Sequence, residues 1–211
     1  MKLTSVTLTV FLLLFTSLSG CIGLEDEYVE ISEDQDTSED SIYSIHCQEY
    51  DFLERCWKLL VPDSLENDTL VPLVVDIHGY TQDMDKHNNM TGFADIAIEE
   101  GFIVVYPNGY ENSWNAGDIC CGVAHQEGID DLNFLLALVE NLTETQPIDT
   151  DRIYVSGWSN GCGMTQMLAV EASELFAAAG CMSFYLIAPP SSNYTPIPFM
   201  EVHGLLDDLI L

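Results

Sequence analysis

A serine set between two glycines is the residue of this chain best suited to nucleophilic chemistry. Gly157, Ser159 and Gly161 form the pattern G-x-S-x-G, which follows the apolar residues 153–155 and precedes a helix-like pattern from Met164. A very tight strand-to-helix turn would strain the serine backbone and crowd any Cβ two residues away, which glycine avoids. The free N–H groups at the start of the helix would point toward the serine oxygen. The pattern therefore predicts Ser159 as an exposed nucleophile; a tight turn with a helix-capping serine is the alternative.

A serine nucleophile needs a general base, a carboxylate that orients the base, and N–H donors for the developing oxyanion. We expect the oxyanion donors to be the backbone N–H of Asn160 and that of Tyr80, with Thr81 as the neighbouring candidate. Asp207 follows the last predicted strand and is our candidate for the carboxylate, and Asp208 could take its place. Either aspartate could instead be a solvated loop acid.

The base is the missing member of this set. In enzymes built around such a serine turn, the histidine follows the acid in the chain, but no histidine stands between Asp207 and Leu211. The five histidines of the chain are His46, His78, His87, His125 and His203. All five precede the acid and have structural or solvated interpretations. We expect a C-terminally truncated domain that lacks its last strand, last helix and histidine loop; the rival is a complete but catalytically dead protein.

The elements that position these residues alternate between strands and helices. Apolar runs predict strands at 56–61, 70–77, 102–106, 152–159, 177–184 and 199–203. Helical spacing occurs at 91–100, from 130 onward and at 164–176, and residues 110–128 form a long loop. This alternation predicts an α/β fold, a mostly parallel sheet with helices on both faces. Its carboxyl strand ends share one edge, where we expect His78, Asn108 and Ser159 to gather.

The amino-terminal segment predicts export. An apolar run over residues 6–18 has the length of a signal-peptide core, and the Leu-Ser-Gly-Cys that follows resembles a lipobox ending at Cys21. We therefore predict a signal peptide with a lipobox at 1–21 and lipidation of Cys21, which would tether the protein to the membrane of the cell envelope. An ordinary secretory signal is the alternative. An acidic linker is predicted at 22–44 and the folded domain at 45–211.

The charge of the chain limits its partners. Thirty-five acidic residues stand against five basic ones, which gives a formal net charge of −30. A chain this acidic is excluded as a nucleic-acid binder on electrostatic grounds, and anionic lipid headgroups would repel it. Any membrane attachment therefore depends on the lipid at Cys21.

The cysteines indicate disulfides. Six remain after Cys21, and an even number in an exported chain favours pairing. The pairings that we favour are Cys47 with Cys56 and Cys162 with Cys181. The adjacent cysteines at 120–121 lack a zinc-type spacing, so we expect no metal site, and the predicted chemistry needs no organic cofactor.

Several sequence blocks together carry a family resemblance. They are VPLVVDIHGYTQ, GFIVVYPNG, WNAGDICCG, RIYVSGWSNGCGM and EVHGLLDD, spread over roughly residues 59–211. In this order they resemble the secreted polyhydroxybutyrate depolymerase and feruloyl/acetylxylan esterase group of α/β-hydrolases. The resemblance implies an α/β-hydrolase fold and a serine carboxylic-ester hydrolase that forms an acyl-enzyme on Ser159, with Asp207 as the triad acid.

The resemblance also implies a substrate and a pocket. Ester substrates in this group are polyesters or polysaccharide-linked esters; polyhydroxybutyrate depolymerase-like activity is our first interpretation, and feruloyl or acetylxylan esterase activity the second. By similarity, Trp158 and Trp114 would line the acyl or aryl pocket, unless they are ordinary core aromatics. The chain departs from the family pattern in the missing histidine and in Cys162. A non-catalytic surface protein that binds ligands on this scaffold, or a related peptide hydrolase, would fit the same blocks.

Overall fold

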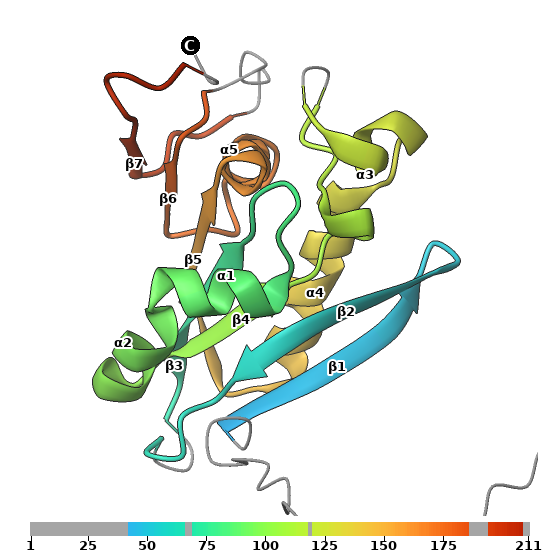
Figure 1. The fold of residues 1–211 in the computed structure, drawn as a ribbon. Helices are drawn as coiled ribbons and strands as arrows, with labels where there is room; N and C mark the ends of the chain where they lie inside the picture. Colours follow the sequence, from blue (N-terminus) through green and yellow to red (C-terminus); the bar gives the residue numbers. More distant parts are fainter. Residues whose placement is uncertain (1–41, 66–68, 118–119, 186–193, 209–211) are drawn as a thin grey trace, which may run out of the picture. The chain divides into compact units, whose positions relative to one another are not determined.

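The computed structural model describes residues 42–65, 69–117, 120–185 and 194–208. The predicted signal peptide, Cys21 and nearly all of the predicted linker lie outside the described residues. Within these ranges the chain forms a seven-stranded sheet in the order β1-β2-β4-β3-β5-β6-β7 (Figure 1). Its strands are β1 (Tyr43–Tyr50), β2 (Leu53–Leu60), β3 (Val71–Ile77), β4 (Ile103–Pro107), β5 (Ile148–Trp158), β6 (Ala178–Met182) and β7 (Phe199–Val202). Strands β3 to β7 are parallel, whereas β2 is antiparallel to both β4 and β1.

Helices cover both faces of this sheet. They are α1 (Met84–Thr91), α2 (Phe93–Glu100), the short η2 (Tyr110–Asn112), α3 (Gly122–Glu127), α4 (Asp131–Thr145) and α5 (Asn160–Glu171). The larger apolar cluster joins alternate residues of β3, such as Val75, to Leu138 of α4 and Leu168 of α5. The smaller cluster joins the intervening residues, such as Val74, to Ala97 of α2. Because β3 buries both of its faces, its sequence is almost continuously apolar, and the predicted α/β sheet is confirmed.

The amino-terminal hairpin is the largest feature that the sequence did not predict. The described strand β1 begins at Tyr43, so the predicted linker boundary at 44 lies inside the strand. Most of β1 is exposed and carries no alternating apolar pattern, which explains why it was missed. Cys47 and Cys56 face one another across the hairpin and form the predicted disulfide.

Three helix predictions also need correction, and one of them is the long loop predicted at 110–128, which contains η2 and α3. Helix α1 lies in a mostly polar stretch for which the sequence predicted no helix; it is capped by Asp83, whose side chain accepts from the N–H of Lys86 at 2.8 Å. Helix α5 starts at Asn160 and not at Met164, since the glycines ahead of Met164 belong to its first turn. None of the described helices is both long and apolar enough to span a bilayer.

Candidate active site

Ser159 lies at the junction of β5 and α5 in a strained backbone conformation. Its φ of 54° and ψ of −119° fall in a region that residues with a Cβ rarely adopt. The flanking glycines make the turn possible. A Cβ on Gly157 would lie 2.5 Å from the carbonyl oxygen of Gly161, and a Cβ on Gly161 would overlap the carbonyl oxygen of Ile77. The tight turn expected from G-x-S-x-G is therefore present, and Ser159 is partly exposed at its tip.

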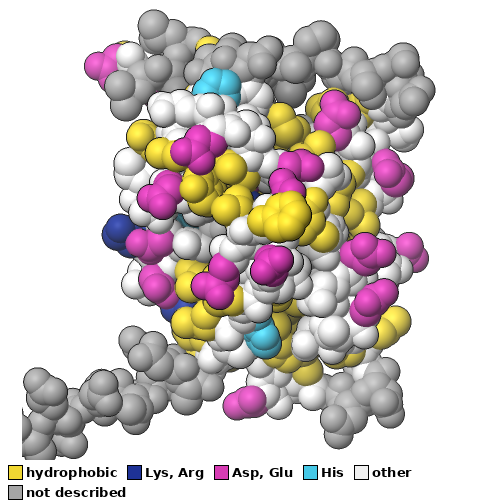
Figure 2. Space-filling view, turned by 90° about the vertical axis from the view of Figure 1, so that its right-hand side faces the viewer, with side chains coloured by type: hydrophobic (Ala, Val, Ile, Leu, Met, Phe, Trp, Pro, Cys, Tyr) yellow, Lys and Arg dark blue, Asp and Glu magenta, His cyan; other side chains and the backbone are white. Residues whose placement is uncertain are grey.

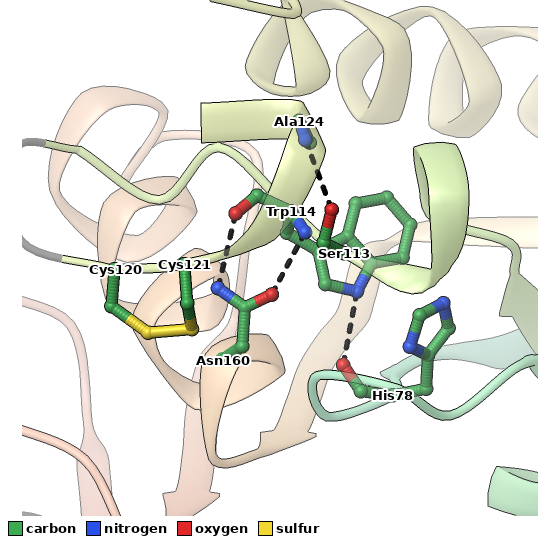
Figure 3. Close-up of a disulfide and its surroundings, with 7 residues drawn as sticks. All are labelled: His78, Ser113, Trp114, Cys120, Cys121, Ala124 and Asn160. Atoms are coloured by element: carbon green, nitrogen blue, oxygen red, sulfur yellow. Dashed lines mark hydrogen bonds between the residues drawn. A yellow bond between two sulfur atoms is a disulfide. The ribbon is translucent and has the colours of Figure 1, made fainter. Parts of the chain in front are cut away.

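Asn160 contributes both a backbone N–H at the start of α5 and a side chain that is hydrogen-bonded to the long loop. As the first residue of α5, it has a backbone N–H without an intrahelical acceptor, which suits an oxyanion donor. Its side-chain amide makes two hydrogen bonds to the backbone of Trp114, accepting from the N–H at 2.8 Å and donating to the carbonyl at 3.0 Å (Figure 3). Both residues are fully buried. The first turn of α5 is thus fastened to the long loop between β4 and α3, a contact that the sequence did not reveal.

The same loop continues along α5. Ala116 lies beside Gly163, because a Cβ added to Gly163 would be 3.2 Å from the Cβ of Ala116. Gly117 lies close to the side chain of Met167. These contacts follow Asn160 at helical spacing, so the loop lies along one face of the helix. Trp114 itself has no exposed surface, and its indole N–H donates to the carbonyl of His78 at 2.9 Å. We therefore assign Trp114 to the core beneath the site, which corrects the expectation that it lines the pocket.

The two oxyanion candidates in the loop after β3 differ in whether their backbone N–H is already hydrogen-bonded. The N–H of Gly79 donates to Oε1 of Gln82 at 3.1 Å, and the N–H of Thr81 donates to the carbonyl of Asn112 at 2.9 Å. Among the described residues no hydrogen bond occupies the N–H of Tyr80. Of the two oxyanion candidates in this loop, Tyr80 is therefore the one with an available donor.

Trp158 lies next to the same loop. Its ring packs where a Cβ on Gly79 would be, with Cε3 only 2.7 Å from that position. The side chain is partly buried and spans the ends of β5 and β3. This placement is compatible with a pocket wall beside Ser159, and it leaves Trp158 as the remaining predicted pocket aromatic.

His78 is a structural histidine in its neutral form. Its Nε2 accepts the backbone N–H of Gly109 at 2.8 Å, so its Nδ1 carries the proton and donates to the carbonyl of Gly79 at 2.8 Å. Complete burial lowers the pKa of His78 to about 4, although the hydrogen bond to Gly79 opposes this shift. Both ring nitrogens are occupied, and the imidazole joins the end of β3 to the chain that follows β4.

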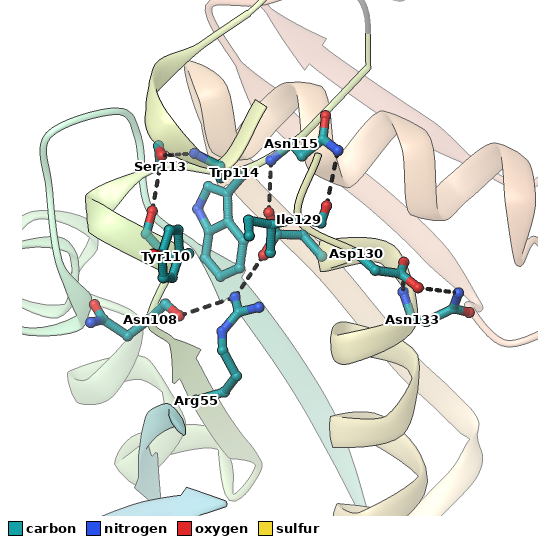
Figure 4. A network of polar contacts seen from close by, with 12 residues as sticks. Arg55, Asn108, Tyr110, Ser113, Trp114, Asn115, Ile129, Asp130 and Asn133 are labelled. Atoms are coloured by element: carbon teal, nitrogen blue, oxygen red, sulfur yellow. Dashed lines mark hydrogen bonds and ion pairs between the residues drawn. The ribbon is translucent and has the colours of Figure 1, made fainter. Parts of the chain in front are cut away.

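A buried ion pair holds the other side of the long loop. Arg55 of β2 contacts Asp131 of α4 at 2.6 Å, and the second carboxylate oxygen accepts the N–H of Asn115 at 2.7 Å (Figure 4). The Arg55 guanidinium also lies 3.9 Å from the ring centre of Phe134. Burial raises the pKa of Asp131, and the charge of Arg55 opposes this rise. From the sequence, Asp131 was predicted only to lie near the start of a helix, and Arg55 had no predicted role.

Two disulfides lie near the start of α5. Cys162 and Cys181 form the predicted bond, which ties the first turn of α5 to β6. Cys120 and Cys121, for which we predicted no pairing, are bonded to each other beside Asn160 (Figure 3). Cys120 packs against the buried cluster of Cys162, Cys181 and Phe184.

Asp207 follows β7, two strands from Ser159 in the sheet. Its Oδ2 lies 3.7 Å from Nε2 of His203, and its side chain is partly buried, whereas Asp208 is exposed. Within the described ranges no histidine is hydrogen-bonded to the Ser159 hydroxyl. His87, the other fully buried imidazole, lies 3.2 Å from Asp76 on the sheet face that α1 covers.

The comparisons with known proteins agree with one another. The family model described as "Esterase PHB depolymerase" matches residues 55–209. The chain is 30% identical over 139 residues to a bifunctional acetylxylan esterase/xylanase of Neocallimastix patriciarum, covering 66% of this chain and 20% of that protein. It is 32% identical over 116 residues to poly(3-hydroxyalkanoate) depolymerase C of Paucimonas lemoignei, covering 51% and 26%. The structure resembles an acetyl xylan esterase from Aspergillus awamori, with a TM-score of 0.53 and 23% identity over 65% of this chain and 51% of that one.

Proposed function

Because the chain belongs to the esterase PHB depolymerase family, we propose that it carries the nucleophile of a serine carboxylic-ester hydrolase on an α/β-hydrolase fold. The observation that carries this proposal is the backbone of Ser159, whose φ of 54° at the end of β5 costs stability that a helix cap alone would not require. A strained turn of this kind exposes the serine hydroxyl next to the N–H of the following residue, here Asn160, which explains why the strain is retained.

The proposed reaction proceeds through an acyl-enzyme. The oxygen of Ser159 attacks the ester carbonyl while a base takes its proton, and the oxyanion accepts hydrogen bonds from the N–H groups of Asn160 and Tyr80. Collapse of the tetrahedral intermediate releases the alcohol, which takes the proton from the base. Water then adds to the acyl group in the same way and frees the acid and the serine.

We assign the general base to a histidine beyond the present sequence, oriented by Asp207. The engagement of both ring nitrogens of His78 and the burial of His87 beside Asp76 support this assignment. The missing strand, helix and histidine loop of our sequence prediction would supply this residue. We propose that the present chain carries the nucleophile and is inactive without that histidine.

Polyesters of hydroxyalkanoates are the substrate class that we propose first, and acetyl or feruloyl esters of plant polysaccharides the second. The similarity to both a poly(3-hydroxyalkanoate) depolymerase and an acetylxylan esterase/xylanase supports ester substrates of this kind.

We further propose that the protein is exported and anchored by lipid at Cys21, with the acidic segment as a tether. The lipobox-like sequence and the composition of that segment support this location.

A non-catalytic binding protein on the same scaffold is the candidate from another class. It is favoured by the absence of any described histidine hydrogen-bonded to Ser159. In such a protein the strained turn would be inherited from an enzyme, and the hydroxyl would form no covalent adduct. This difference can be measured directly.

Fluorophosphonate labelling separates the two proposals. We expect the full-length protein to be labelled, the 211-residue chain to be labelled far more weakly, and Ser159→Ala to abolish the signal. Ser64→Ala, at an exposed serine in a turn before β3, is the matched control and should label as the parent does. Unlabelled but folded full-length protein would refute the enzyme and support the binding protein. Labelling that survives Ser159→Ala would reject Ser159 as the nucleophile.

A further inference from the structure

The tip of the β1–β2 hairpin carries an aromatic residue in an unfavourable backbone position. Asp51 and Phe52 form the two-residue connection, with φ angles of 49° and 63°. Positive φ at both positions is the pattern that favours Asn-Gly in tight hairpins, because other side chains crowd the backbone there. Phe52 is nevertheless present, and it is 90% exposed. Glycine would serve the turn better, so the local fold does not explain the phenyl ring.

The hairpin that carries Phe52 is fixed by a disulfide and by an aromatic contact with α4. The Cys47–Cys56 disulfide joins the two strands at directly opposed residues. Tyr50, just before the turn, packs against Phe134 of α4 with ring centres 5.9 Å apart. The phenyl ring of Phe52 is therefore displayed on an ordered element, and binding through it would cost little additional chain ordering.

The turn lies on the edge of the sheet that carries Ser159. Strand β1 is antiparallel to β2, and β2 is antiparallel to β4, so β1 points in the same direction as the parallel strands. The end of β1 and the end of β5 therefore point to the same edge of the sheet, and the hairpin tip projects past α4 (Figure 1). Tyr80, which follows β3 at this edge, is 46% exposed. A surface presented to Ser159 would also meet these aromatic rings.

The surroundings of the ring limit the chemistry of its partner. Glu49, Asp51 and Glu54 are exposed around the tip, and the chain carries a net charge of −30. On the face shown in Figure 2, hydrophobic side chains alternate with acidic ones, and lysine and arginine are scarce. Anionic lipids and polyanions would be repelled from such a surface, whereas an uncharged apolar solid would not.

We propose that Phe52 anchors the protein on the surface of a solid, uncharged polyester, so that Ser159 faces the polymer chains. This inference rests on the proposed function for its substrate class. Contact buries the phenyl ring, and the removal of one such side chain from water changes affinity about ten- to a hundredfold. Salt should strengthen adsorption, because it screens repulsion between neighbouring molecules of high negative charge.

Adsorption to poly(3-hydroxybutyrate) particles tests the proposal without requiring turnover. Full-length protein carrying Phe52→Gly should bind about tenfold or more weakly than the parent, yet unfold at an equal or higher temperature, because glycine relieves the strained turn. Leu70→Ser is the matched control: Leu70 is 56% exposed but precedes β3, at the opposite edge. It should bind as the parent does, and so should Ser159→Ala.

Three results would overturn the proposal. They are unchanged adsorption of Phe52→Gly, an equal loss in Leu70→Ser, and Phe52-dependent binding to phosphatidylcholine vesicles in place of the polyester. Hydrolysis of a soluble short-chain ester by the full-length protein should be unaffected by Phe52→Gly. If that activity is absent in the parent while Phe52-dependent adsorption persists, the proposed function fails and the anchoring surface stands.

Discussion

Truncation of the Asn160 side chain is the most direct test of how the site is built. Asn160→Ala leaves the N–H and the carbonyl of Trp114 without partners in a region that has no exposed surface. A buried polar group that loses its partner costs about 1–3 kcal/mol. The two groups together should lower the free energy of unfolding by about 2–6 kcal/mol, a large share of the 5–15 kcal/mol that is typical of a domain.

Asn160→Asp tests the same hydrogen bonds through the pH dependence of stability. A carboxylate can still accept from the Trp114 N–H, but it meets the Trp114 carbonyl with no proton to donate. Burial then raises the pKa of this aspartate in the folded state above its unfolded value. Below the unfolded pKa both states bind the proton, so the variant should resemble Asn160 there. Stability should fall as the pH rises through the unfolded pKa toward the folded one, because the folded state binds more protons in that window.

Denaturant unfolding followed by circular dichroism, at pH 4 and pH 7, measures these effects. Asn133→Ala is the matched control, since Asn133 also lies in the first turn of a helix but makes its hydrogen bonds to Asp130 at the surface. Its effect should stay within about 0.5 kcal/mol. If Asn160→Ala is as mild as this control, or if Asn160→Asp shows no dependence on pH, the bonds to Trp114 do not hold the loop.

Two further outcomes follow from the geometry. Gly161→Ala should destabilise the fold by more than about 2 kcal/mol through backbone overlap, whereas Gly180→Ala, whose added Cβ finds its nearest neighbour at 3.6 Å, should cost about 1 kcal/mol or less in the same unfolding assay. Comparable losses in the two variants would contradict the steric argument. For His78, the folded pKa of about 4 lies below the unfolded 6.5, so stability should decline by about 3 kcal/mol as the pH falls from 6.5 to 4, because only the unfolded state binds the proton there. His78→Gln should flatten that part of the pH profile, and an unchanged profile would exclude His78 as its cause.

The local parts of the site could be predicted from the sequence, and the distant contacts could not. The turn at Ser159 was predictable because its glycines and its flanking apolar run act within a few residues. The partners of Asn160 and Arg55 lie 46 and 76 residues away, and a single sequence contains no periodicity that pairs them. The prediction for Asn160 used only its backbone N–H, and Arg55 had no predicted role.

The misplacement of Trp114 has a related cause. Trp114 was placed in the pocket by family resemblance, but the loop bends inward and places the indole between Arg55 and the carbonyl of His78. Strand β1 was missed for the opposite reason. Its residues face solvent, and the evidence for the strand is its pairing with β2, not an apolar pattern of its own.

The long loop is attached to the rest of the molecule through its main chain as well as through the buried indole of Trp114. Two helix side chains bind its main chain. Asn160 makes hydrogen bonds to the peptide groups of Trp114, and Asp131 accepts the N–H of Asn115. The route of this segment is therefore encoded in part by residues outside it. Its exposed positions can therefore vary, in evolution or in a mutant library, while the contacts with Asn160 and Asp131 stay in place.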